Sequence, residues 1–225
     1  MVVSDAPLAT RVGVEVLRSG GSAVDAAVAT AFALAVVWPT AGNIGGGGFA
    51  LLNVGGETAA LDFREVAPAA ARRGMYLDAR GTLTGKSVTG HLAAGVPGSV
   101  AGLWALHEKH GTRPWRDLIQ PAIELADGGF VVDTDYHEQI GLELARLRQF
   151  PATTRTFLPG GDAPAVGSRV SNPELARTLR SIQASGLTGF YAGETAGRLL
   201  AEMRRGGGIV TAADLATYGR SGERR

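Results

Sequence analysis

The stretch GGGGFALLNVGGETAALDFR, residues 45–64, contains two runs of strand-forming residues separated by a pair of glycines. The runs are residues 49–54 and 57–63, and Gly55-Gly56 lies between them. Glycine pairs favour the tight turns that connect antiparallel strands, so the sequence predicts a β-hairpin. Because the first run is apolar on both faces, we expect layers of structure to cover it on both sides, as in a sandwich.

The register of this hairpin places an arginine beside a stretch of bare backbone. If Gly55-Gly56 forms a two-residue turn, Gly47 lies opposite Arg64 at the far end of the strands. A ligand can approach backbone that lacks side chains closely, and successive N–H groups of Gly46, Gly47 and Gly48 can form an anion-binding nest. The planar guanidinium binds carboxylates through two parallel hydrogen bonds. The pattern therefore favours a carboxylate site at Arg64.

Two acidic residues near Arg64 leave its role open at this point. Asp62 lies on the same strand face and is expected to orient the guanidinium. In the alternative interpretation Arg64 is a solvated residue at the strand end, paired with Asp62 or Glu65, and the glycines only permit close packing.

Composition narrows the class of protein. The chain has 225 residues, of which 45% are hydrophobic and 19% charged, as in ordinary globular proteins of one large or two small domains. The net charge of +1 does not indicate a nucleic-acid partner. The absence of cysteine excludes disulfides, thiolate metal sites and a cysteine nucleophile. Residues 23–38 are apolar but too short to predict a membrane span, and residues 1–5 do not resemble a signal peptide.

Helices are expected on both sides of the hairpin. One begins near Leu8 and ends at Gly20-Gly21, and Ser22 with Asp25 forms a capping box for a second, buried helix that reaches Pro39. Further helices are predicted over residues 99–109, 115–127, 134–148, 173–185 and 190–205, with a short one after Thr211. Residues 151–171 are expected to form a loop and residues 220–225 a tail.

Several segments together resemble the N-terminal part of gamma-glutamyltranspeptidases. They are PLAT (7–10), GGSAVDA (20–26), GNIGGGGF (42–49), LDFREVAP (61–68), GVPGSVAG (95–102), QPA (120–122) and IVTAADLATY (209–218). They occur in the family's order over nearly the whole chain.

The resemblance implies an α/β (α+β) fold, part of a four-layer αββα sandwich of the N-terminal-nucleophile hydrolases. Residues 1–218 would be the large-subunit portion of one such domain, with an incomplete sheet, and residues 219–225 a divergent tail. The family transfers or hydrolyses the γ-glutamyl group of glutathione and related amides. Its enzymes bind the α-carboxylate of that group with an arginine, and the resemblance implies that Arg64 is this arginine. Asp62, Gly46, Gly47 and Gly48 would support it.

The resemblance also implies what this chain does not supply. The family's nucleophile is a threonine at the start of a small subunit released by self-cleavage, so we expect the small subunit as partner and no catalytic residue within this chain. The chain is thus expected to be a truncated large subunit, inactive alone, without cofactor or metal. The parent enzyme is expected in the periplasm or outside the cell.

Other classes of function remain as alternatives. The chain could belong to a related acylase or amidohydrolase, to a non-catalytic protein that binds γ-glutamyl compounds, or to a fragment without function. His107 and His110 are three residues apart, whereas the helical zinc motif needs four. The glycine run lacks the Lys-Ser/Thr ending of a P-loop, and a strand follows it where a dinucleotide fingerprint requires a helix.

Overall fold

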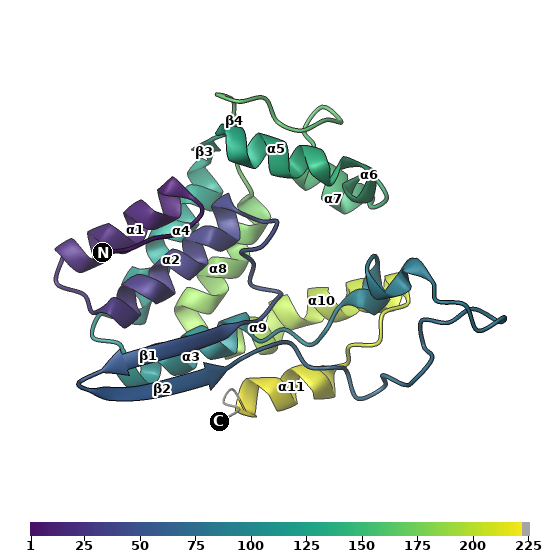
Figure 1. Ribbon diagram of the computed structural model, residues 1–225, viewed down its shortest axis with the longest axis horizontal. Helices are drawn as coiled ribbons and strands as arrows, with labels where there is room; N and C mark the ends of the chain where they lie inside the picture. Colours follow the sequence, from purple (N-terminus) through teal and green to yellow (C-terminus); the bar gives the residue numbers. More distant parts are fainter. Residues whose placement is uncertain (222–225) are drawn as a thin grey trace. The chain divides into compact units, whose positions relative to one another are not determined.

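The computed structural model describes residues 1–221, and the chain divides into two units that alternate along the sequence (Figure 1). The first unit comprises Met1–Asn43 and His110–Gln183. The second comprises Ile44–Lys109 and the chain from Ala184 onward. The hairpin and all the residues predicted to bind a ligand belong to the second unit.

A buried helix forms the core of the first unit. Helix α2 (Ala23–Val37) begins at the predicted capping box, in which the Asp25 N–H donates to Ser22 Oγ and the Ser22 N–H to Asp25. It packs against α1 (Pro7–Arg18) and α4 (Trp115–Gly128), with the rings of Phe32 and Trp115 edge to face at 5.4 Å. Since α2 is apolar nearly all round, burial between neighbours is the arrangement its sequence predicts.

The remainder of the first unit departs from the sequence expectation in two places. The helix predicted over residues 134–148 is divided into α5 (Thr134–Leu142) and α6 (Leu144–Leu147), because Glu143 leaves the helical conformation. The stretch expected to be a loop contains the helix α7 (Pro151–Phe157). Proline suits the first position of this helix, because an N–H there would have no partner within the helix. Strands β3 (Phe130–Val131) and β4 (Arg169–Val170) pair antiparallel, and α8 (Pro173–Ser185) follows.

The predicted hairpin is confirmed in the second unit. Strands β1 (Phe49–Val54) and β2 (Glu57–Asp62) pair antiparallel in the expected register, with Val54 opposite Glu57. Gly55 and Gly56 have φ angles of 63° and 87°, which residues with side chains rarely adopt. Phe63, one residue beyond β2, packs against α3 (Ser99–His110), since a Cβ atom at Gly102 would meet its ring. Two short 3₁₀ turns, η1 (Gly85–Ser87) and η2 (His91–Ala93), precede α3.

The last part of the second unit is helical. The single helix predicted over residues 190–205 is interrupted at Ala192, whose extended backbone separates α9 (Thr188–Tyr191) from α10 (Gly193–Gly206). Helix α11 (Ala212–Ser221) follows the predicted Thr211 cap and includes the first residues of the stretch expected to be a tail. Residues 222–225, the rest of that stretch, lie outside the described residues.

Within this chain, one apolar face of the hairpin is exposed to solvent. Leu51 is 80% exposed and Phe49 67% exposed, whereas Ala50 and Leu52 on the other face are partly buried. The cover expected on both faces is therefore present on one of them only. No helix among residues 1–221 is long and apolar enough to cross a membrane.

Candidate substrate-binding site

Arg64 lies directly beyond the hairpin, at the position that the register predicts. The Phe63 N–H donates to the Gly48 carbonyl at 2.9 Å, so the ladder continues one pair past β1 and β2. Gly47 then packs against the backbone around Arg64, and a Cβ atom at Gly47 would come within 2.5 Å of the Phe63 carbonyl oxygen. A side chain at Gly47 would therefore push the two strand ends apart.

The guanidinium of Arg64 is exposed and partly engaged. Its Nε donates to Glu65 Oε2 at 3.1 Å, and its Cζ lies 5.7 Å from the centre of the Phe49 ring. The Arg64 side chain is 60% exposed, so the ion pair is worth no more than about 1 kcal/mol. Among the described residues, no group bonds to its two terminal nitrogens. The edge of the fork that binds a carboxylate is thus open.

Asp62 supports Arg64 differently from the sequence expectation. Its Oδ1 accepts a hydrogen bond from the Arg64 backbone N–H at 2.9 Å, and the guanidinium pairs with Glu65 instead. An aspartate two residues before an N–H commonly makes this local bond, because its short side chain reaches its own backbone. Asp62 therefore fixes the main chain at Arg64 and leaves the guanidinium to Glu65.

The glycine run is a packing element in this structure. None of Gly46, Gly47 and Gly48 is among the glycines of residues 1–221 that have positive φ, so their backbone lacks the alternating handedness of an anion-binding nest. The Gly46 carbonyl instead accepts from the N–H groups of Gly98 and Ser99, at 2.7 and 2.9 Å. The run thereby joins the hairpin to the start of α3.

Four of the segments recognised in the sequence meet at Arg64. The glycine run contacts the segment 95–102 through Gly46, and Val66 pairs with Val96 in an isolated antiparallel bridge. The Tyr218 hydroxyl, from the C-terminal segment, donates to the Arg64 carbonyl at 2.7 Å. Sequence reasoning included this tyrosine in a recognised segment but gave it no role at Arg64, because no local pattern connects residues so distant along the chain.

The histidines do not form a metal centre. His91 Nε2 lies 2.7 Å from Glu202 Oε1, and Glu202 also accepts from Arg205. The bonds from Arg205 and His91 lower the pKa of Glu202 to about 2. His107 lies beside Trp104, with ring centres 6.4 Å apart. In the described part of the chain, no three His, Asp or Glu side chains are grouped so that they could hold a metal ion.

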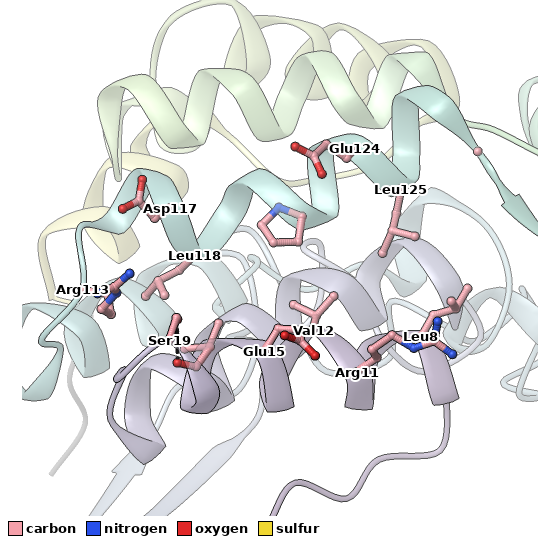
Figure 2. A pocket seen from close by; sticks show the side chains of 13 residues that line it. Leu8, Arg11, Val12, Glu15, Ser19, Arg113, Asp117, Leu118, Glu124 and Leu125 are labelled. Carbon is pink, nitrogen blue, oxygen red and sulfur yellow. Dashed lines mark hydrogen bonds between the residues drawn. The ribbon is translucent and has the colours of Figure 1, made fainter.

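The first unit contains a cavity of about 660 Å³ between α1 and α4 (Figure 2). Figure 2 shows apolar side chains, among them Val12, Leu118 and Leu125, pointing into the space between the two helices. Charged side chains lie among them, and one of these, Glu15, pairs with Arg18 along the same helix at 2.6 Å. The Ser19 hydroxyl in the lining donates to the Val16 carbonyl and not to a base, so we interpret the cavity as a groove between two amphipathic helices.

The fold and the site together define a class of protein. It is a mixed α/β protein that presents an arginine at the end of a glycine-flanked hairpin. The gamma-glutamyltranspeptidase family model matches residues 9–224. The glutathione hydrolase proenzyme of Pseudomonas sp. (strain A14) is 49% identical over 221 residues, which are 97% of this chain and 38% of that protein. The chain belongs to the gamma-glutamyltranspeptidase family, which is a family of enzymes.

Solved structures support the fold. The crystal structure of Helicobacter pylori gamma-glutamyltranspeptidase matches with a TM-score of 0.95 and 43% identity, over 97% of this chain and 63% of that chain. Cephalosporin acylase from Bacillus halodurans matches with a TM-score of 0.85 and 32% identity, over 94% of this chain and 40% of that chain. The predicted fold class, the large-subunit portion of an N-terminal-nucleophile hydrolase, is confirmed. The chain spans about 38% of the length of the first curated relative.

Proposed function

We propose that this chain provides the carboxylate-binding arginine of an enzyme that transfers or hydrolyses the γ-glutamyl group of glutathione and related amides. The observation that carries the proposal is the open edge of the Arg64 guanidinium, presented beyond the end of the hairpin where Gly47 packs against the Arg64 backbone. The α-carboxylate of a γ-glutamyl group is a small planar anion, and a guanidinium binds it through two parallel hydrogen bonds. Glu65 occupies Nε alone, so the bond to Glu65 and the carboxylate are compatible.

In this proposal the residue that cleaves the amide bond belongs to the small subunit. In this proposal a threonine at the start of the small subunit attacks the γ-carbonyl carbon, forms an ester and releases the amine. Water or an acceptor amine then attacks the ester and regenerates the threonine. The small subunit also covers the exposed hairpin face at Phe49 and Leu51. Residues 1–218 form the large-subunit portion of the shared domain, and the parent enzyme works outside the cytoplasm.

The role of Arg64 is tested by substitution in the protein that also contains the small subunit. We expect Arg64→Ala to lower kcat/KM for a γ-glutamyl anilide at least tenfold, because a bidentate bond to a charged group is worth about 2–4 kcal/mol. Arg64→Lys should recover only part of the loss, since it keeps the charge but not the fork. The matched control is Arg80→Ala, which removes another exposed arginine of the same unit.

A second substrate separates carboxylate binding from general damage. The 4-aminobutanoyl anilide is the same amide without the α-carboxylate, so Arg64→Ala should hardly change its kcat/KM. An unchanged kcat/KM for the γ-glutamyl anilide in Arg64→Ala would remove Arg64 from the site. An equal loss for both substrates would assign it a structural role.

The match to cephalosporin acylase favours a second candidate, a related acylase of the same fold. The two candidates differ in the amides that they cleave. Preferential cleavage of amides other than γ-glutamyl amides by the protein that also contains the small subunit would favour the acylase.

A further inference from the structure

We propose that Tyr218 is a positioning residue, which fixes the direction in which the Arg64 side chain leaves the backbone. Helix α11, in which Tyr218 lies, would thereby adjust substrate affinity without touching substrate. The inference rests on the proposed function, because it names what holds the carboxylate-binding arginine in place.

Side-chain hydrogen bonds hold both the backbone N–H and the backbone carbonyl of Arg64. The Arg64 N–H donates to Asp62 at 2.9 Å, and its carbonyl accepts from the Tyr218 hydroxyl at 2.7 Å. Ladder pairing between the strands ends one residue earlier, at Phe63. Without Tyr218 the Arg64 carbonyl would lose the one hydrogen bond that it accepts among the described residues.

Tyr218 is itself fixed by burial and by stacking on a second tyrosine. It is 8% exposed, and its ring stacks on that of Tyr191 with centres 6.1 Å apart and planes 10° apart. The Tyr191 hydroxyl donates to the Pro97 carbonyl at 2.8 Å and accepts from the Ala101 N–H at 3.3 Å. Burial raises the pKa of the Tyr191 hydroxyl above its usual value, so it keeps its proton and remains a donor. The stack anchors Tyr218 to the start of α3.

The start of α11 is hydrogen-bonded to the segment that follows Arg64. Asp214 Oδ2 accepts from the Thr211 N–H at 2.8 Å, which caps the helix. Its other oxygen accepts from the Ala69 N–H, also at 2.8 Å. Burial alone would raise the pKa of Asp214, but the hydrogen bond from the Thr211 hydroxyl, together with those from the Ala69 and Thr211 N–H groups, outweighs it and lowers the pKa, so the carboxylate stays charged. Asp214 and Tyr218 thus hold α11 to the chain on the C-terminal side of Arg64.

The consequence concerns binding rather than chemistry. If the strand end takes several orientations, only a fraction of molecules presents the guanidinium correctly, and the apparent affinity falls by that fraction. A contact to a remote carboxylate is made equally in the ground state and the transition state, so KM should change and kcat should not.

The test is Tyr218→Phe in the protein that also contains the small subunit, because it removes the hydroxyl and keeps the stacked ring. We expect KM for a γ-glutamyl anilide to rise about three- to tenfold with kcat within twofold, the range that one lost hydrogen bond of this kind allows. In an Arg64→Ala background the same substitution should add nothing, because both act through one contact.

The matched control is Tyr76→Phe, which removes a hydroxyl that donates to the Leu92 carbonyl in the same unit. It should leave KM within twofold. If Tyr218→Phe is insoluble, Asp214→Asn replaces it as the test variant, with an expected rise of about twofold in KM.

The outcomes separate the two proposals. If Arg64→Ala leaves KM unchanged, the proposed function fails. If Arg64→Ala raises KM but Tyr218→Phe behaves like Tyr76→Phe, the positioning role is overturned and the proposed function stands. A further rise in KM from Tyr218→Phe in the Arg64→Ala background would also overturn it, because the tyrosine would then act independently of the arginine.

Discussion

Replacing Asp25 by alanine should be among the most damaging single substitutions in the first unit. Asp25 is 0% exposed, and its carboxylate accepts from the Ser22 N–H at 2.7 Å. It also accepts from the Thr112 N–H at 3.0 Å and the Thr112 hydroxyl at 2.6 Å. One side chain thus caps α2 and attaches it to the segment that leads into α4.

The magnitude follows from these contacts. Loss of the helix cap costs about 1 kcal/mol. The Thr112 N–H and hydroxyl also lose a charged acceptor, and because Thr112 is exposed and water replaces part of each bond, the two together are worth about 3 kcal/mol. We therefore expect Asp25→Ala to lower the free energy of unfolding by about 4 kcal/mol, near the upper limit for a single substitution.

The assay is urea denaturation of the protein with its small subunit, followed by tryptophan fluorescence. The control is Asp135→Ala, which also removes an acidic residue from the first turn of a helix but an exposed one, and should cost less than about 1 kcal/mol. A loss at Asp25 no larger than that at Asp135 would refute the reasoning.

The pH dependence of stability gives an independent measurement. Burial by itself would raise the pKa of Asp25, but hydrogen bonds from Thr112 and Ser22 outweigh it and lower the pKa from 3.8 to about 2. A carboxylate with a lowered pKa in the folded state stabilises at pH above its unfolded value and loses this effect as the pH falls. About 2 kcal/mol should be lost between pH 4 and pH 2, and Asp25→Asn should not show this loss.

Four further predictions concern the second unit and the isolated chain. Gly102→Ala in α3 should destabilise by more than about 2 kcal/mol, because the new Cβ would meet the buried ring of Phe63. Gly197→Ala in α10, where nothing lies within 4 Å, should stabilise by about 0.5–1 kcal/mol, and the urea denaturation described above measures both substitutions. The chain expressed alone should not turn over γ-glutamyl anilides, and activity that a substitution in this chain abolishes would contradict the assignment of the nucleophile to the small subunit. The chain alone should also aggregate, because the Leu51 face of the hairpin is bare, and become soluble on co-expression with a small subunit; a sharp thermal transition of a soluble monomer would contradict this.

Features controlled by neighbouring residues could be predicted from the sequence. The capping box at Ser22 and Asp25 and the register across Gly55-Gly56 depend on residues a few positions apart, and both were found as expected. Interruptions were harder to predict. The break at Ala192 and the two-residue strands β3 and β4 have weak local signals, because their conformation depends on pairing and packing with residues far along the chain.

By itself the sequence determined the family, the hairpin and the position of Arg64 at its end. The physical reason is that a two-residue turn and strict strand alternation allow one register. Only the tertiary structure decided what surrounds the arginine: Glu65 rather than Asp62 pairs with the guanidinium, and Tyr218, 154 residues away, bonds to its carbonyl. The contact with Tyr218 arises because separate segments pack together, so no pattern within either segment contains it, whereas Glu65 was already one of two neighbours that the sequence offered.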